Sequence, residues 1–235
     1  MGYIMDMKHF YRESGAEHQN VCPLVLLHGN GEDSSYFVHQ LEYFGTSRRV
    51  IAIDTRGHGN TPRGERPFTI RQFSDDLLVF LDEHDLKQVD LLGFSDGGNI
   101  ALIFTINHPE RVRRLILNGA NLYGSGVKSR YQLPIVAAYH AAKRFAHKDP
   151  KALKKAEMLG LMVNDPNIDP SELKRVQSRT LLITGTKDMI KDSHTELIQN
   201  NIPKSHWVRL DGDHFIANKE PDEFNVVVEI FLDEN

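Results

Sequence analysis

A serine flanked by glycines is the residue of this chain best suited to nucleophilic chemistry. The run Gly93-Phe94-Ser95-Asp96-Gly97 matches the pattern G-x-S-x-G, and it follows an apolar strand pattern and precedes a helical one. In this context the serine sits on a tight turn that lifts its hydroxyl above the edge of a sheet. Side chains at positions 93 and 97 would collide with the neighbouring chain, so both positions require glycine. The sequence therefore predicts Ser95 as a nucleophile.

A serine hydroxyl needs a general base, and that base needs a carboxylate to orient it. Of the 12 histidines, His214 stands apart because its loop follows the last predicted strand and precedes the final helix. Asp188 follows the preceding strand in the same way. Loops after parallel strands reach one edge of the sheet, so we expect Ser95, Asp188 and His214 to meet there as nucleophile, acid and base. Three other aspartates remain alternatives for the acid: Asp192, Asp211 and Asp213.

The oxyanion that forms during acyl transfer needs two backbone N–H donors close to the nucleophile. The N–H of Asp96 is predicted to lie at a helix N-terminus, where partial positive charge stabilises an anion. The second donor should come from the loop Leu26-Leu27-His28-Gly29-Asn30-Gly31, which closes an early strand. Asn30 is the better candidate, with Gly31 as the alternative. We expect structural, bracing roles for three other residues of these loops: His28, Asp54 and Arg56.

The elements that must position these residues alternate between short apolar runs and helical patterns. The runs lack polar alternation, as expected for parallel strands that are covered on both faces. The repeated strand–helix–strand order implies an α/β sheet with right-handed crossovers. The predicted strands are 24–28, 50–54, 89–93, 115–118, 181–185 and 207–210, and the predicted helices include 70–84, 99–107 and 220–232. The opening segment, 3–11, alternates more and is expected to form an antiparallel edge hairpin.

Residues 120–179 interrupt this order, because they contain helical patterns at 135–147 and 150–163 but no strand. We expect them to form a helical lid over the carboxyl edge of the sheet, with 1–119 and 180–235 as the core domain. Residues 120–180 carry 11 Lys and Arg against 5 Asp and Glu. A solvated helix face explains this charge more simply than an anion-binding lid does. Three lid tyrosines could bind substrate or simply form the core of the lid: Tyr123, Tyr131 and Tyr139.

The composition excludes several classes of protein. The net charge of −4 over 235 residues argues against a dedicated nucleic-acid binder. The single cysteine, Cys22, excludes an internal disulfide framework and a multi-cysteine zinc site. The apolar runs fall far short of the ~20 residues that span a bilayer, and the charged N-terminus is not a secretory signal. We expect a soluble, cytoplasmic protein without metal, cofactor, nucleic acid or membrane partner. The sequence leaves open whether the protein forms a homodimer.

Together these residues resemble the α/β-hydrolase family over essentially the whole chain. The shared marks are His28-Gly29, Asp54 with Arg56-Gly57-His58-Gly59, the turn around Ser95, 185–188 and 212–214. The resemblance implies an eight-stranded, mostly parallel sheet with helices on both faces and a small helical lid. It also carries the family's serine, acid and histidine over to Ser95, Asp188 and His214.

The segment 93–98, with Asn118-Gly119-Ala120-Asn121 downstream, is similar to the biphenyl-hydrolase-like subgroup, which includes amino-acid ester hydrolases. Related haloalkane dehalogenases and epoxide hydrolases use an aspartate nucleophile, so Ser95 counts against both.

The leading hypothesis is a serine hydrolase that cleaves small or medium carboxylic esters through an acyl-enzyme on Ser95. The same triad would serve a thioesterase, a carbon–carbon-bond hydrolase or an aminopeptidase, and a non-catalytic ligand-binding homologue could retain it. The side chain of Asp96 lies beside the nucleophile and could pair with a cationic substrate group, such as the ammonium of an amino-acid ester. The basic lid favours anionic substrates instead.

Overall fold

A seven-stranded sheet forms the centre of the molecule, in the strand order β1-β3-β2-β4-β5-β6-β7. The computed structural model describes residues 6–234. All neighbouring strands are parallel except β1, which pairs antiparallel with β3. The strands are β1 (Tyr11–Ser14), β2 (Leu24–Leu27), β3 (Val50–Ile53), β4 (Val89–Phe94), β5 (Val112–Asn118), β6 (Arg179–Gly185) and β7 (Ser205–Leu210). The predicted α/β architecture is therefore confirmed.

The prediction of eight strands was wrong for the described residues, because the N-terminal edge contributes one strand and no hairpin. Residues 6–10 form no strand. Instead the carboxylate of Asp6 pairs with the buried guanidinium of Arg56 at 2.8 Å and accepts the backbone N–H of Arg66 at 2.9 Å. These contacts draw the segment toward the loop after β3 and away from the sheet edge. Residues 1–5 of the predicted hairpin lie outside the described residues.

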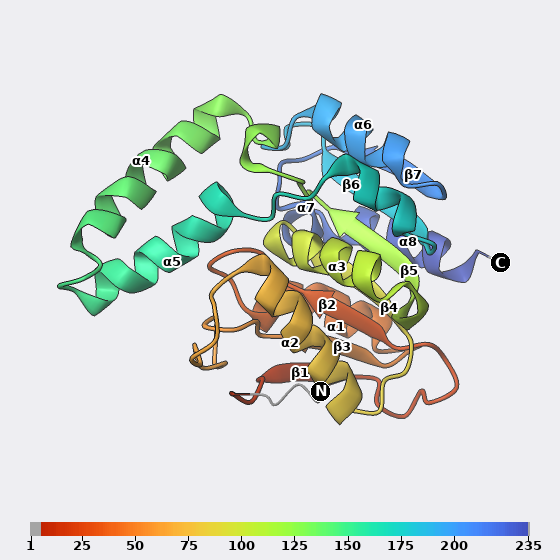
Figure 1. The fold of residues 1–235 in the computed structure, drawn as a ribbon. Coiled ribbons are helices and arrows are strands. Elements are labelled where there is room, and N and C mark those ends of the chain that lie inside the picture. Colours follow the sequence, from red (N-terminus) through yellow and green to blue (C-terminus); the bar gives the residue numbers. More distant parts are fainter. Residues whose placement is uncertain (1–5, 235) are drawn as a thin grey trace.

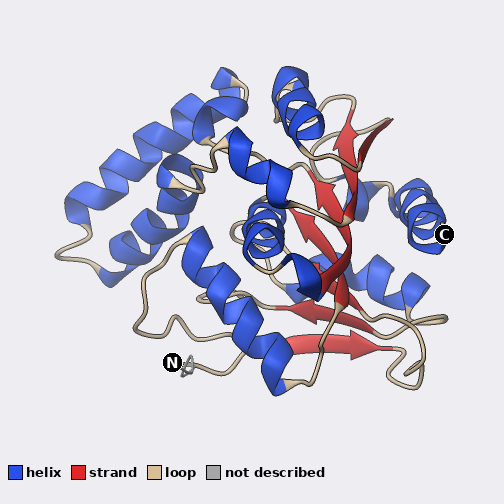
Figure 2. Cartoon of the chain, turned by 45° about the vertical axis from the view of Figure 1, so that its right-hand side comes forward, coloured by secondary structure: helices blue, strands red, loops and turns tan. Residues whose placement is uncertain are grey.

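Helices cover both faces of the sheet, as Figure 2 shows. Alternate side chains of a strand point to opposite faces: Val25 and Leu27 pack in one hydrophobic cluster with α2 and α3, whereas Leu24 and Leu26 pack in another with α1 and α8. Both clusters consist of buried apolar side chains, and their packing against the sheet fixes the strands that lead to the carboxyl edge. The helices are α1 (Val38–Phe44), α2 (Ile70–Glu83), α3 (Asp96–Asn107), α4 (Ser129–Phe145), α5 (Pro150–Asn164), α6 (Asp192–Asn201), α7 (Ile216–Lys219) and α8 (Pro221–Asp233).

The helical insertion between β5 and β6 contains α4 and α5, which lie side by side and project from the body (Figure 1). Its inner end is attached to the core by polar contacts. The carbonyl oxygen of Met158 in α5 accepts the Nδ2 amide of Asn30 at 2.7 Å, and Glu157 pairs with Arg63 at 2.6 Å. Helix α4 begins six residues before the predicted start, because the chain turns into it directly after residue 128. Within the described part of the chain, no helix combines the length and the apolarity that crossing a bilayer requires.

Candidate active site

The turn between β4 and α3 holds Ser95 in a conformation that few side chains adopt. Its φ is 54° and its ψ is −118°, and its N–H donates to the carbonyl oxygen of Asn118 at 2.8 Å. A Cβ at position 93 would lie 2.3 Å from the carbonyl oxygen of Gly97, and a Cβ at position 97 would lie 2.1 Å from that of Leu27. The predicted need for glycine at both positions is confirmed. The two glycines let the chain pack closely around the turn, and this packing stabilises the strained backbone of Ser95, whose conformation costs about 1–3 kcal/mol.

Ser95, His214 and Asp188 form a continuous hydrogen-bonded chain. The Oδ1 atom of Asp188 accepts the Nδ1–H of His214 at 2.7 Å, which leaves Nε2 to accept the hydroxyl of Ser95 at 3.0 Å. Asp188 is 1 % exposed and His214 5 % exposed. The Asp188 carboxylate also accepts the N–H of Ile190 at 2.9 Å. A buried carboxylate fixed in this way orients the imidazole and stabilises it when it takes up a proton.

The other three aspartates that the sequence left open have different partners. Asp192 pairs with Arg209 at 3.1 Å, and Asp211 accepts the hydroxyl of Thr186 at 2.8 Å. Asp213 accepts the N–H of Phe215 at 2.8 Å and pairs with Lys219. None of these carboxylates has a hydrogen bond to the ring of His214, so the geometry selects Asp188.

A glycine that the sequence offered only as part of a resemblance makes room for the imidazole. Gly119 has a φ of +65°, and a Cβ there would lie 2.6 Å from Cε1 and 2.8 Å from Nδ1 of His214. Any side chain at this position would push the imidazole out of line with the serine. The sequence could have indicated this role of Gly119, because the residue directly follows the strand that became β5, beside the turn that carries Ser95.

Two backbone N–H groups near Ser95 are available to bind an oxyanion. Among residues 6–234, neither the N–H of Asn30 nor that of Asp96 has a hydrogen-bond acceptor. The N–H of Asp96 opens helix α3, where the helix dipole adds positive potential. Both N–H groups therefore remain free to serve as the oxyanion-hole donors that the sequence predicts.

The side chain of Asp96 is buried beside the elbow and held by amides. Its carboxylate accepts the Nδ2 amides of Asn30 at 2.9 Å and of Asn99 at 3.3 Å. Asn99 is held in turn by Asn121, whose N–H donates to its Oδ1 at 2.9 Å. Burial raises the pKa of Asp96 to about 6, against the opposing effect of the Asn30 hydrogen bond. The carboxylate keeps free lone pairs, so it can accept a further donor.

Within residues 6–234, none of the three tyrosines predicted as substrate-binding residues forms a hydrogen bond or a ring contact with Ser95, Asp188 or His214. Tyr139 is buried between α4 and α5, and its hydroxyl accepts the Nδ2 amide of Asn164 at 3.0 Å. Tyr123 packs edge-on against His194 at 4.7 Å, and the guanidinium of Arg130 lies 4.7 Å from the ring of Tyr131. Tyr139 therefore belongs to the packed interior of the insertion, which is one of the two roles that the sequence left open for it.

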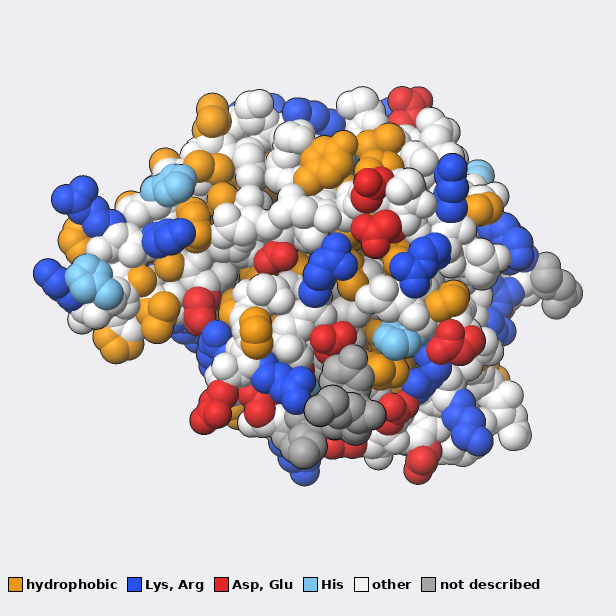
Figure 3. Space-filling model, in the orientation of Figure 1, with side chains coloured by type: hydrophobic (Ala, Val, Ile, Leu, Met, Phe, Trp, Pro, Cys, Tyr) orange, Lys and Arg blue, Asp and Glu red, His pale blue; other side chains and the backbone are white. Residues whose placement is uncertain are grey.

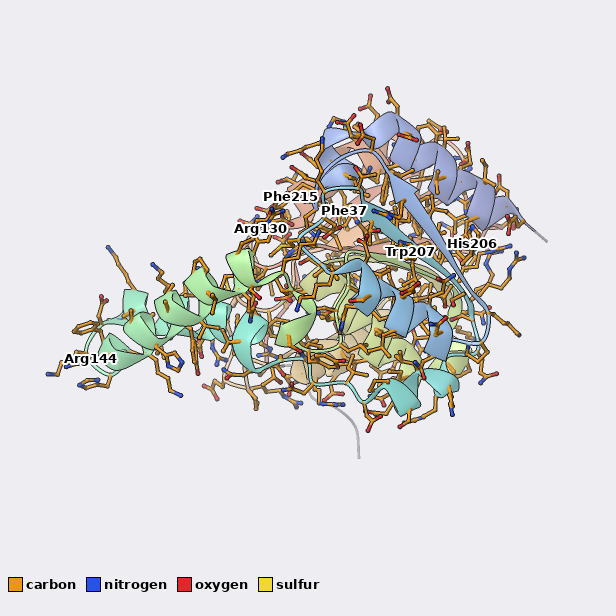
Figure 4. The ribbon with its side chains drawn as sticks, turned by 90° about the horizontal axis from the view of Figure 1, so that it is seen from above. Phe37, Arg130, Arg144, His206, Trp207 and Phe215 are labelled. Carbon is orange, nitrogen blue, oxygen red and sulfur yellow. The ribbon has the colours of Figure 1, made fainter. Side chains whose placement is uncertain are left out.

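Aromatic rings that the sequence analysis did not select surround the histidine instead. The ring centroid of Phe94 lies 4.9 Å from that of His214, and Phe94 stacks on Tyr36 at 4.5 Å with nearly parallel planes. Phe215 lies 5.6 Å from both Phe94 and His214 and is 40 % exposed. Figure 4 shows Phe215 on the side of the body nearest the start of the insertion. Phe94 and Phe215 adjoin Ser95 and His214 in sequence, which was the signal that could have found them.

The expected bracing residues have structural contacts. Nδ1 of His28 donates to the carbonyl oxygen of Gly29 at 2.7 Å while Nε2 accepts the N–H of Thr55 at 3.0 Å, and burial lowers the pKa of this imidazole. Asp54 accepts the N–H of Ser34 at 2.7 Å, and Arg56 forms a bidentate pair with Asp76 at 2.7 Å. These contacts tie the loops after β2 and β3 together.

Glu32, which the sequence analysis did not select, stabilises the turn that presents Asn30. Its Oε2 accepts the N–H of Gly29 at 3.1 Å, and its own N–H donates back to the Gly29 carbonyl at 3.3 Å. Burial raises the pKa of this half-buried carboxyl to about 7. The side chain therefore acts through the loop rather than on a substrate.

We expect Glu32→Ala to lower kcat about tenfold with little change in KM, because loosening this turn displaces a donor whose full loss costs about 10²–10³ in kcat. Glu32→Gln keeps an acceptor oxygen for the Gly29 N–H and should restore most of the rate. Steady-state kinetics on a neutral ester measures both values. An equal loss in the two variants would show that the charge, not the hydrogen bond, matters.

The surface has two grooves large enough to be considered as substrate sites. One of about 570 Å³ lies between α5 and the loop after β3, and its lining includes Phe68, Leu153 and Met158. Met158 also contacts Asn30 through its carbonyl, so this groove adjoins the oxyanion loop. A larger groove of about 760 Å³ lies between β7 and α8 at the amino edge of the sheet, and neither groove is lined by a triad residue. No three His, Cys, Asp or Glu side chains of the described residues gather to hold a metal ion.

Comparison with known families agrees with this geometry. Residues 23–155 match the family model described as alpha/beta hydrolase fold. The chain is 29 % identical over 245 aligned residues to the serine hydrolase BPHL of Mus musculus, with 95 % of this chain and 82 % of that protein covered. It is 30 % identical to the 2-hydroxymuconate semialdehyde hydrolase of Pseudomonas sp. (strain CF600), with 69 % of this chain and 55 % of that protein covered.

Solved structures share the fold over nearly the full length. The enol-lactonase from Burkholderia xenovorans LB400 superposes with a TM-score of 0.81 at 23 % identity, covering 97 % of both chains. A hydrolase from Pseudomonas aeruginosa PA01 superposes with a TM-score of 0.77 at 25 % identity, covering 97 % of this chain and 95 % of the other.

Proposed function

The chain belongs to the family of proteins with the α/β-hydrolase fold, and from this premise we propose that it is a serine hydrolase of small or medium carboxylic esters. The observation that carries the proposal is the hydrogen-bonded chain from the Ser95 hydroxyl through His214 to the buried carboxylate of Asp188. The similarity to hydrolases over most of the chain supports the same class of reaction.

In the proposed mechanism the Ser95 hydroxyl attacks the ester carbonyl while Nε2 of His214 takes its proton. The tetrahedral oxyanion accepts the N–H groups of Asn30 and Asp96, and each such donor is worth roughly 3 kcal/mol. The C–O bond to the alcohol then breaks, and the imidazolium returns the proton to the leaving alkoxide. Water, deprotonated by the same histidine, attacks the acyl-enzyme and releases the acid and the free serine. Asp188 stabilises the imidazolium in both halves.

The groove of about 570 Å³ beside α5 supports a substrate of small or medium size, because it adjoins the loop of Asn30 and its walls combine the apolar Phe68 and Met158 with charged side chains such as Arg63. The triad alone does not separate esters from thioesters or from carbon–carbon bonds, since each passes through an oxyanion. Two phenylalanine rings lie beside His214, the buried Phe94 and the 40 % exposed Phe215. We assign the leaving group to the side of Phe215, because it must receive its proton from His214.

A fluorophosphonate probe tests the proposal on the native protein. The expected result is one covalent label per chain and faster turnover of acetate and butyrate esters than of matched thioesters. An unlabelled protein would support the non-catalytic alternative, in which the scaffold binds a ligand without cleaving it. A preference for thioesters would keep the triad and change the substrate class.

A second candidate substrate, an amino-acid ester, is favoured by the buried carboxylate of Asp96 beside the nucleophile. An ammonium needs an anionic partner, and the pKa of Asp96 at about 6 means that this anion is present above pH 6 and is lost as the pH falls through that value. We therefore propose that the preference for an amino-acyl ester over a neutral ester of the same shape declines below pH 6.

We expect Asp96→Ala to lower kcat/KM at pH 7.5 about tenfold more for an amino-acyl ester than for its neutral isostere, as loss of one charge-assisted contact implies. The ratio of the two esters, measured from about pH 5 to about pH 7, cancels the pH effects that both esters share and stays below the pKa of the substrate ammonium, at about 7.7. Asn99→Ala is the matched control, because it removes a hydrogen bond to Asp96 but leaves the carboxylate in place. Equal slowing of both esters would remove Asp96 from ammonium recognition.

A further inference from the structure

The far end of the α4–α5 hairpin concentrates positive charge. Residues 143–155, here called the hairpin tip, contain six Lys and Arg and a single acid, Asp149. Asp149 is the N-cap of α5, and its carboxylate accepts the N–H of Lys151 at 2.8 Å. All six cations are exposed: Lys143, Arg144, Lys148, Lys151, Lys154 and Lys155.

The cations of the hairpin tip have no anionic partner in the part of the chain that the structure describes. None of the six forms an ion pair within residues 6–234, and the polar contact of Lys143 is with the ring of Tyr139, 5.3 Å away. The nearest acid along α5, Glu157, is already engaged by Arg63 at 2.6 Å. The charge of the hairpin tip is therefore not used in holding the fold together.

Two large apolar side chains are exposed among these cations. Phe145 ends α4 and is 57 % exposed, and Leu153 lies in the first turn of α5 and is 47 % exposed. Figure 4 shows Arg144 at the extreme end of the projecting hairpin, far from the labelled core residues. In Figure 3 blue Lys and Arg side chains alternate with orange apolar ones at the same end of the molecule.

We propose that the hairpin tip docks on an anionic lipid surface, with the six cations near the headgroups and Phe145 and Leu153 inserted between them. Clusters of four to eight Lys and Arg beside exposed apolar side chains match the chemistry of anionic bilayers, which attract each nearby cation. The hairpin tip is a projecting end with Phe145 exposed at its outside, whereas Leu153 also borders the groove beside α5, so a surface that binds this end covers one rim of that groove. This contact needs no spanning helix.

Co-sedimentation with vesicles tests the proposal. The native protein should bind vesicles of equal parts phosphatidylcholine and phosphatidylglycerol and not vesicles of phosphatidylcholine alone. Raising NaCl from about 0.1 M to about 1 M should release it, because the screening length falls from about 10 Å to about 3 Å. Failure to bind the anionic vesicles at low salt would overturn the proposal.

Charge reversal at the hairpin tip locates the contact. The double variant Lys148→Glu and Lys151→Glu should weaken vesicle binding at least tenfold. The matched control, Lys87→Glu with Lys204→Glu, changes the net charge equally at the amino edge of the sheet and should bind as the native protein does. Equal loss in both variants would show a non-specific charge effect and overturn the proposal.

A separate variant tests the apolar part. Phe145→Ser with Leu153→Ser should also weaken binding, while a thermal melt shows that each variant is folded. The alternative partner of the hairpin tip is a second copy of this chain, and light scattering tests it by measuring the oligomeric state. If the native protein is dimeric and the hairpin-tip variants are monomeric without vesicles, the surface is an interface between copies and the lipid proposal fails.

Discussion

Ser95→Ala is expected to abolish ester turnover, with kcat more than about 10⁴-fold below that of the native protein. Removing the nucleophile of a serine hydrolase costs up to about 10⁶ in kcat, because base, acid and nucleophile act as a unit. The remaining N–H donors and binding contacts cannot form the acyl-enzyme. The same variant should lose the fluorophosphonate label entirely.

The loss should come without unfolding. The Ser95 hydroxyl forms its hydrogen bond with His214, and the imidazole stays anchored by Asp188 at 2.7 Å. Alanine at position 95 would adopt the same strained φ of 54° as serine, so the free-energy cost of the backbone conformation is unchanged. We expect the melting temperature to move by less than about 4 °C, the shift that about 1 kcal/mol produces in a chain of this size. Turnover retained by a folded Ser95→Ala protein would remove Ser95 from the mechanism.

Asp188→Asn is expected to lower kcat about 10⁴-fold while KM changes little. The asparagine amide can donate to Nδ1 of His214, which moves the ring proton to Nε2. That nitrogen then points an N–H at the Ser95 hydroxyl and cannot accept its proton. The imidazolium also loses the negative charge that stabilises it.

Asp213→Asn is the matched control for this effect. Asp213 lies next to His214 in sequence but pairs with the exposed Lys219 and accepts the N–H of Phe215. Its replacement should leave kcat within about a factor of three, since a solvent-exposed pair contributes at most about 1 kcal/mol. Kinetics on a p-nitrophenyl ester compares the two variants, and an equal loss in both would contradict the choice of Asp188 as the acid.

Local sequence was enough to predict the parts of the site that depend on chain neighbours. The elbow at Ser95 needs glycine two positions away on each side; the clash at position 93 arises within the turn itself, whereas the clash at position 97 is with Leu27 at the end of the neighbouring strand β2. The strands were predicted because their unbroken apolar runs report burial on both faces. The order of the loops then placed Asp188 and His214 at the same edge of the sheet as Ser95.

Other features depend on contacts that join distant positions, and the sequence left them open or missed them. The choice among four aspartates needed the position of the imidazole, 26 residues from Asp188 and 119 from Ser95. The edge hairpin predicted at 3–11 failed because Asp6 is drawn to Arg56, 50 residues away. Tyr139 could not be assigned to the lid's interior until α4 and α5 were seen to pack together.

By itself, then, the sequence determined the fold class and was enough to propose Ser95 as the nucleophile and His214 as its base, because periodic burial and tight turns are properties of short segments. Only the tertiary structure showed that Asp188 is the aspartate bonded to His214, that the amides of Asn30 and Asn99 donate to Asp96, and that Glu32 accepts the N–H of Gly29. The physical reason is that hydrogen bonds act over about 3 Å. Whether two polar groups come that close depends on how the strands and loops between them are packed.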